Sequence, residues 1–233
     1  MKLVFILGRA PKEQEKVILE EHESYGDIIV EDFIDSYTNL TLKSLFILKW
    51  IEMKCPQVKY VMKTDDDMFI NIPNLKKSLE DPKLPSPLLM GNLICNAHPI
   101  KNRWSKWYSP SYMFSGKYPN YVSGTAYVFS GNMAKKLLEA AIQTPYFHLE
   151  DVYLTGICAQ KLGLKAINCK GFSYLKRALN PCIYKDIISA HEVSIKEMKK
   201  IWNMLHNQSI LEKCQAIYKG VLNPSEPRKC VYK

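Results

Sequence analysis

The sequence has 233 residues, of which 47% are hydrophobic and 24% are charged, and its formal net charge is +9. This length suits one large domain with a sizeable core, and the composition excludes a disordered tail, a coiled coil and a disulfide-dense miniprotein. Lysine and arginine are scattered among acidic residues, so we expect a solvated basic surface and no nucleic-acid partner. No apolar run approaches the roughly 20 residues that span a bilayer.

Strand-like and helix-like runs alternate in the first part of the chain. This alternation is typical of a parallel sheet flanked by helices, which predicts the α/β class. The expected strands are residues 3–7, 27–30 and 59–62, and the expected helices are residues 13–24 and 40–54.

Further strand and helix signals follow, and no repeat or linker separates them. We therefore expect a single domain over residues 1–233. The expected elements are strands at 88–93, 121–129 and 183–190, helices at about 134–145 and 150–163, and a helix opened by the capping-box pair Ser194 and Glu197.

The segment from residue 96 to residue 120 is rich in aromatic side chains, lysine and proline. Loops of this length are usually functional or disordered, and the aromatic residues argue against disorder. The segment either packs its own rings or covers a ligand and stacks on a sugar. In the second case Trp104 is the candidate for contact with an acceptor.

The cysteines alone do not decide whether the protein belongs to the cytosol or to the secretory pathway. The seven cysteines contain no C-x-x-C pair and no zinc-like spacing with histidine, so no metal-thiolate site is expected. Their number suits a reducing cytosol or a few disulfides in the secretory pathway. Glycosylation triplets that begin at Asn39 and Asn207 favour the secretory lumen.

An apolar strand runs directly into Asp65, Asp66 and Asp67. Three adjacent carboxylates repel one another, and a divalent cation relieves that repulsion. The carboxyl end of a parallel strand is also where open α/β sheets bind ligands. The triplet therefore indicates Mg²⁺ or Mn²⁺ shared with ligand phosphates, with a solvated acidic turn as the alternative.

Two other parts of the sequence contain candidate catalytic or metal-binding residues. Glu150 and Asp151 open a predicted helix, where acids are favoured by the helix dipole and where a carboxylate can also serve as a general base. His191 follows a predicted strand and is either a structural residue or a further ligand for Mn²⁺. No phosphate-binding glycine loop, EF-hand or serine nucleophile elbow is present, which leaves metal-mediated diphosphate binding.

These motifs occur in a fixed order that covers nearly the whole chain. They are YGDII at 25–29, DFIDSY at 32–37, NLTLK at 39–43, KTDDD at 63–67, Tyr118-Pro119 with Tyr121, Ser123 and Gly124, EDVY at 150–153, and His191 ahead of Glu197-Met198 and Ile201-Trp202.

In this order they resemble the β-1,3-galactosyltransferase family of inverting glycosyltransferases, which also holds β-1,3-N-acetylglucosaminyltransferases and Fringe-like enzymes. The resemblance implies a nucleotide-sugar-binding fold of the GT-A type, with a mixed, mostly parallel sheet flanked by helices. It also implies a UDP-sugar donor and Mn²⁺, with Mg²⁺ as the alternative ion.

The resemblance further implies a role for individual residues. Asp151 is the expected catalytic base, Glu150 lies in the acceptor site, and Asp67 and His191 bind the metal. Contacts to the nucleotide sugar are expected from Asp35, Lys43, Asp65, Asp66 and Gly124.

The function implied is transfer of galactose from UDP-galactose in β-1,3 linkage to an N-acetylhexosamine at the end of a glycan on a glycoprotein or glycolipid. The alternatives are transfer of N-acetylglucosamine, an inactive lumenal binding protein and, more distantly, a metal-dependent phosphohydrolase. Full-length relatives are expected to be single-pass type II membrane proteins of the Golgi lumen. Because Met1 lies almost on the first strand, we expect a chain truncated at its N-terminus, without the segment that holds the membrane span.

Overall fold

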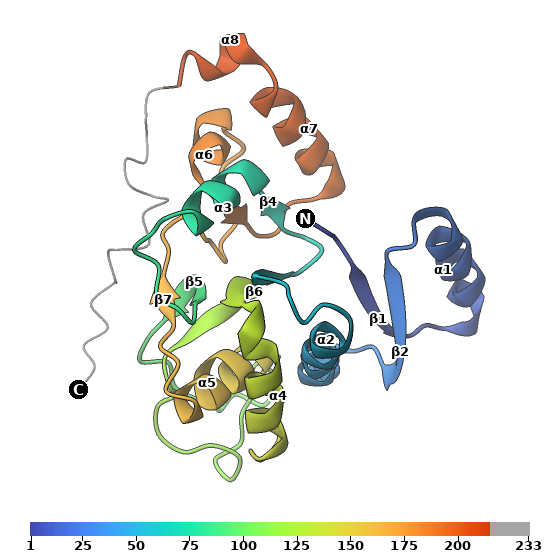
Figure 1. Ribbon diagram of the computed structural model, residues 1–233, viewed down its shortest axis with the longest axis vertical. Coiled ribbons are helices and arrows are strands. Elements are labelled where there is room, and N and C mark those ends of the chain that lie inside the picture. Colours follow the sequence, from blue (N-terminus) through green and yellow to red (C-terminus); the bar gives the residue numbers. More distant parts are fainter. Residues whose placement is uncertain (215–233) are drawn as a thin grey trace.

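The computed structural model describes residues 1–214, and Figure 1 shows how its elements are arranged. Helices and strands alternate along the chain, as predicted. The elements are β1 (Phe5–Arg9), α1 (Lys12–Tyr25), β2 (Ile28–Ile34), η1 (Tyr37–Asn39), α2 (Leu40–Lys54), β3 (Tyr60–Thr64), β4 (Phe69–Ile70), α3 (Ile72–Leu79), β5 (Leu89–Ile94), β6 (Tyr121–Ser130), η2 (Gly131–Met133), α4 (Ala134–Ile142), η3 (Val152–Cys158), α5 (Ala159–Lys161), β7 (Ile167–Asn168), α6 (Pro181–Asp186), β8 (Ser189–Ala190), α7 (Ile195–Leu205) and α8 (Gln208–Leu211).

The central sheet has the strand order β3-β6-β5-β7. Strand β6 is antiparallel to both β3 and β5, whereas β5 and β7 are parallel. A parallel pair, β1 and β2, and an antiparallel pair, β4 and β8, lie outside this sheet. The α/β class and the mixed sheet with flanking helices are therefore confirmed. The expectation of mostly parallel pairing is wrong, because β6 runs against both of its neighbours.

Both faces of β6 are buried, in two separate apolar clusters. Val122 and Phe129 belong to the larger cluster, which includes residues of α2 and α4. Ala126 and Val128 point to the second cluster, with residues of α3. A third cluster lies between α6 and α7. Because side chains alternate along a strand, burial on both sides holds β6 rigidly, and with it the residues at its start.

The predicted strand at 183–190 is wrong over most of its length. Residues Pro181–Asp186 form α6, and only Ser189–Ala190 form a strand, β8. The Asn180 side chain accepts a hydrogen bond from the Cys182 N–H, and Pro181 occupies the first turn. Asparagine followed by proline is a strong helix start, and this local signal outweighs the β-propensity of the isoleucines.

The capping box of α7 is confirmed. The Ser194 hydroxyl accepts from the Glu197 N–H at 3.3 Å, and the Glu197 carboxylate accepts from the Ser194 N–H at 2.9 Å.

The helix expected at 150–163 is also present, but Val152–Cys158 has π-helical hydrogen bonding. Such wide turns inside helices often occur at functional sites.

A disulfide joins Cys182 at the start of α6 to Cys214, which follows α8. It closes a loop with a sequence separation of 32 residues and so ties the last described helices together. Cys230 lies outside the described residues.

None of the helices within residues 1–214 combines the length and the apolar character of a bilayer span.

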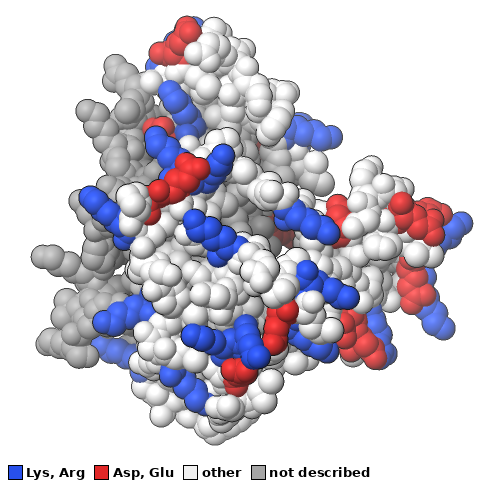
Figure 2. All heavy atoms as spheres, viewed as in Figure 1, with Lys and Arg blue, Asp and Glu red and all other residues white. Residues whose placement is uncertain are grey.

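Positively and negatively charged side chains are mixed on one face of the molecule. Figure 2 shows lysine and arginine interspersed with aspartate and glutamate over the face in view. This distribution agrees with the solvated basic surface that the sequence predicts.

Candidate functional site

The pairing of β4 with β8 brings the aspartate triplet next to His191. Phe69 pairs with Ala190, so the segment just before β4, which holds Asp67, runs beside the segment just after β8, which holds His191. The Asp67 Oδ2 atom lies 3.2 Å from the His191 Nε2 atom. With Asp65 they offer three ligand atoms that all lie within 4.8 Å of one another. These three residues form a possible metal site.

Two contacts show that this cluster suits a divalent cation. The Asp67 Oδ1 atom is buried and has no hydrogen-bond partner among the described residues. The His191 Nδ1 atom lies 3.0 Å from the Tyr174 carbonyl oxygen and donates its proton there, which leaves Nε2 to face Asp67. An imidazole held in this way presents a lone pair at Nε2, and a metal ion would satisfy both that nitrogen and the unpaired carboxylate oxygen.

The cluster differs from the predicted ligand pair in one member. Asp65, which we expected only in contact with the nucleotide sugar, lies with Asp67 and His191. Asp66 is exposed and is not part of the group. The triplet lies in the turn between β3 and β4, and this turn brings Asp65 and Asp67 to the same cluster while Asp66 stays exposed.

We expect His191→Ala to weaken Mn²⁺ binding by at least about tenfold, because even outer-shell partners of a metal ligand have effects of this size. The melting temperature should change little. The matched control is His206→Ala, because the His206 Nδ1 atom also lies on a carbonyl oxygen, that of Trp202, at 2.8 Å. Calorimetric titration of Mn²⁺ measures both variants. Equal losses of Mn²⁺ affinity and stability in His191→Ala would indicate a purely structural histidine.

A buried lysine connects the aspartate triplet to the acids of the next motif. The Lys63 side chain is 10% exposed, and its Nζ atom donates to Asp65 Oδ1 at 2.9 Å and to the Gly124 carbonyl oxygen at 2.8 Å. Glu150 Oε2 lies 3.6 Å away. Burial alone would lower the pKa of Lys63, but the carboxylates of Glu150 and Asp65 outweigh it and raise the pKa above its ordinary value.

Asp151 is held by backbone N–H groups on both of its carboxylate oxygens. Oδ2 accepts from Gly124 at 3.1 Å, and Oδ1 accepts from Val152 at 2.8 Å. Burial and the charge of Glu150 raise the pKa of Asp151 to about 6, although these hydrogen bonds and Lys63 oppose the rise. A carboxylate with this pKa is ionised at neutral pH and accepts protons better than an ordinary aspartate.

Gly124 lies directly against this pair of acids. A Cβ atom at this position would lie 3.2 Å from Glu150 Oε2 and 3.2 Å from the Asp151 Cβ. The predicted role of Gly124 is contact with the nucleotide sugar. In the structure its carbonyl oxygen accepts from Lys63 and its N–H donates to Asp151.

Asp35 and Lys43 form an ion pair of 2.8 Å, which places the two predicted donor-site residues together. Asp35 Oδ2 also accepts from the Gly8 N–H at 2.9 Å. A Cβ atom on Gly8 would approach the Phe33 carbonyl oxygen to 2.6 Å, so only glycine fits here. Sequence reasoning missed Gly8, because its contact with Asp35 depends on the pairing of β1 with β2.

The aromatic segment packs some of its rings against each other and leaves others exposed. Phe114 packs on Tyr118 at a ring-centroid distance of 4.9 Å, which is the self-packing role. Trp104, by contrast, is 96% exposed. Lys106 Nζ lies 5.3 Å from the Tyr37 ring and 4.9 Å from the Trp107 ring.

Tyr37 and Trp107 are site residues that the sequence reasoning did not single out. The Lys106 ammonium lies over the rings of both side chains. Burial, followed by the charge of Asp151, raises the pKa of Tyr37, which places this ring in the electrostatic field of the acids. Tyr37 belongs to the block DFIDSY, so the motif itself carried a signal.

The two predicted glycosylation sites differ in exposure. Asn39 is half-buried, and its Nδ2 atom donates to the Ile34 carbonyl oxygen at 2.8 Å. Asn207 is exposed and caps α8, with Oδ1 accepting from the Ile210 N–H at 3.3 Å.

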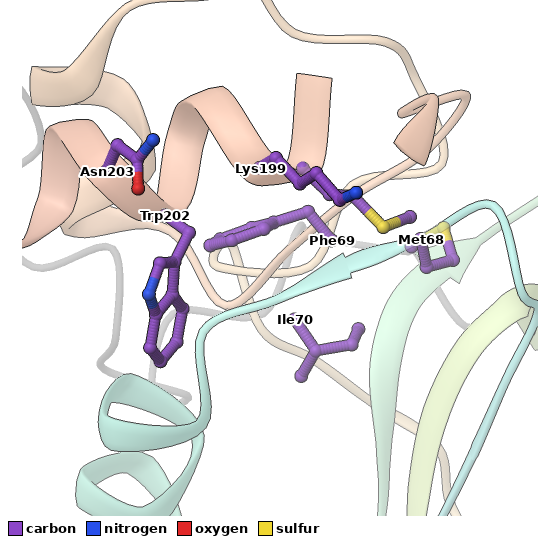
Figure 3. Close-up of a pocket in the computed structure, with 7 residues that line it drawn as sticks. Met68, Phe69, Ile70, Lys199, Trp202 and Asn203 are labelled. Carbon is purple, nitrogen blue, oxygen red and sulfur yellow. The ribbon is translucent and has the colours of Figure 1, made fainter. Parts of the chain in front are cut away.

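A separate open cavity of about 530 Å³ lies between β4 and α7 (Figure 3). Its lining is mostly apolar and contains none of the predicted site residues, so the candidate chemistry lies elsewhere. The lining residues are Met68, Phe69, Ile70, Met198, Lys199, Trp202 and Asn203.

Comparisons with known proteins agree with the motifs. The family model described as Galactosyltransferase matches residues 1–170. The chain is 39% identical over 211 residues to "Beta-1,3-galactosyltransferase 1" of Mus musculus and of Homo sapiens, which covers 89% of this chain and 64% of the relative. It is 38% identical to "Beta-1,3-galactosyltransferase 2" of Homo sapiens, covering 87% of this chain and 50% of the relative.

The chain thus spans between half and two thirds of the length of these relatives. A solved structure, "crystal structure of a glycosyltransferase involved in the glycosylation of the major capsid of PBCV-1", matches with a TM-score of 0.40 and 15% identity, over 87% of this chain and 100% of that chain. Because the family model matches most of the chain and the relatives reach 39% identity, this chain belongs to the galactosyltransferase family.

Proposed function

We propose that this chain carries the active site of an inverting β-1,3-galactosyltransferase that uses UDP-galactose and a glycan ending in N-acetylhexosamine. The observation that carries the proposal is Asp151, a carboxylate with a pKa raised to about 6 and held in place by two backbone N–H groups. Family membership and the names of the relatives support galactose as the sugar.

The proposed reaction is a single displacement. An acceptor hydroxyl gives its proton to Asp151 while its oxygen bonds to the anomeric carbon of galactose. The bond from that carbon to the diphosphate oxygen breaks on the opposite face, and UDP leaves with the electron pair. Positioning and proton removal together lower the barrier, because a neutral hydroxyl is a weak nucleophile.

Asp67 and His191, joined by Asp65, would hold the divalent cation, for which Mn²⁺ is proposed and Mg²⁺ is the alternative. When bound, the cation offsets the negative charge that develops on the departing diphosphate. Asp66, Gly124 and the ion pair of Asp35 with Lys43 are proposed for contact with the nucleotide sugar. Glu150 and Trp104 are proposed for the acceptor side.

The proposed location is the Golgi lumen, in a single-pass type II membrane protein that acts on glycoproteins or glycolipids. The disulfide between Cys182 and Cys214 supports an oxidising compartment. Asn39 and Asn207 are proposed glycan acceptors, and the whole chain is proposed to form one catalytic domain.

Calorimetric titration of UDP with and without Mn²⁺ tests the donor site, and an assay with UDP-galactose and acceptors ending in N-acetylglucosamine tests the reaction. We expect Mn²⁺-dependent binding of UDP and transfer of galactose. Preference for UDP-N-acetylglucosamine would change the proposed sugar. A folded chain that binds no UDP with Mn²⁺ would contradict the proposed function.

A further inference from the structure

Lys63 has hydrogen-bond and ion-pair partners in three separate parts of the chain. Asp65 follows β3, Gly124 lies in β6, and Glu150 precedes η3, yet all three lie within 3.6 Å of the Lys63 Nζ atom. A buried ammonium is unfavourable unless its protons are satisfied by partners, so the position of each partner depends on the others.

The contacts continue from Lys63 to Asp151 through the backbone of one residue, Gly124. The Gly124 carbonyl accepts from Lys63, and the Gly124 N–H donates to Asp151 Oδ2. Glu150 is held from its other side by Tyr127, whose hydroxyl donates to Oε1 at 2.7 Å. Moving the lysine therefore moves the groups that orient Asp151.

We propose that Lys63 is a positioning residue for the transfer step, which holds Gly124 and Glu150 in place and keeps the Asp151 carboxylate ionised. This inference rests on the proposed function, since it assigns to Lys63 the task of preparing the proposed base. The lysine itself need not touch the substrate.

Charge supports the same assignment. Glu150 destabilises the ionised form of Asp151, and Lys63 is the cationic side chain that opposes it. The other ionisable groups that interact with Asp151 come from β6, from η1 and from the loop before β6. They are Tyr121, Tyr127, Tyr37 and Tyr118. Asp65, which follows β3, interacts with Lys63.

The test compares Lys63→Met with Lys63→Arg, which keeps the charge. The acid limb of the kcat profile is the fall in kcat toward low pH. In Lys63→Met we expect the midpoint of this fall to shift to higher pH by about one unit, because the positive charge near the Asp151 carboxylate has been removed. Starting from a pKa of about 6, the kcat at pH 6 would fall about fivefold from ionisation alone. In Lys63→Arg the acid limb should stay in place, whatever the plateau rate.

The matched control is Lys135→Met, which removes a lysine paired with Glu52 at 3.6 Å on the surface between α4 and α2. If the role of Lys63 were purely structural, Lys63→Met would have a lower kcat at all pH values, and the midpoint of the acid limb would not shift. If Lys63→Met does not fold, Lys63→Gln replaces it, since the amide can still donate to the Gly124 carbonyl.

A second readout does not depend on activity. The Asp151 carboxyl carbon is followed by ¹³C NMR titration in metal-free buffer, with Asp151→Asn used for its assignment. The midpoint should rise in Lys63→Met and stay in Lys63→Arg and Lys135→Met. An unchanged midpoint in folded Lys63→Met would overturn the proposal. A wild-type chain without transfer activity would contradict the proposed function alone, because the NMR titration still tests Lys63.

Discussion

Asp151→Asn is expected to lower kcat for galactose transfer by about 10²- to 10⁴-fold, the range typical of a lost general base. Asparagine has the same shape and can still accept one of the N–H bonds from Gly124 and Val152, but it cannot take a proton at neutral pH. UDP binding should persist, because the donor contacts are proposed elsewhere. Initial rates and calorimetry separate the two effects.

The control for this variant is Asp81→Asn, which changes a carboxylate that accepts from the Lys83 N–H in the turn after α3. It should transfer galactose at the wild-type rate. Retained turnover in Asp151→Asn would place the base on another residue, and loss of UDP binding would indicate a broader disturbance of the site.

The activity of the wild-type chain should fall as the pH drops through about 6. The pKa of Asp151 is raised to about 6, so the ionised form that accepts the proton predominates above this pH and disappears below it. Rates at saturating donor between about pH 5 and pH 8 measure this limb. An acid limb near pH 4, where an ordinary aspartate titrates, would contradict the role given to burial and Glu150.

Asp67→Ala is expected to abolish Mn²⁺-dependent binding of UDP. The substitution removes one of three clustered ligand side chains, and it removes the buried Oδ1 atom that has no protein partner. Stability in metal-free buffer should change little, because the unpaired oxygen contributes no hydrogen bond and the backbone carbonyl of Asp67 still accepts from Val193. Calorimetry with UDP and Mn²⁺, together with thermal unfolding, measures both properties.

Asp81→Ala is the control, since it deletes a carboxylate at the far end of α3. It should bind UDP with Mn²⁺ as the wild type does. Unchanged metal-dependent binding in Asp67→Ala would exclude the assignment of this cluster as the metal site. A large loss of stability without metal would instead make the pair with His191 a structural contact.

Local signals in the sequence predicted much of the fold. Helix α2 begins and ends at the predicted residues, and the capping box opens α7 as predicted. These features depend on neighbours a few residues apart, where periodicity and capping act. The prediction of a strand at 183–190 was wrong for an equally local reason. The helix-start signal of Asn180 and Pro181 was not weighed against the β-propensity of the isoleucines that follow.

By itself the sequence determined the α/β class, the motifs and their order, and through them the resemblance to the family. Only the tertiary structure decided that Asp65 joins Asp67 and His191, and that Lys63 lies between the two acidic motifs. The physical reason is separation along the chain. Lys63 and Gly124 are 61 residues apart, and they meet because β3 pairs with β6. Such contacts come from long-range strand pairing and burial, which local patterns do not encode.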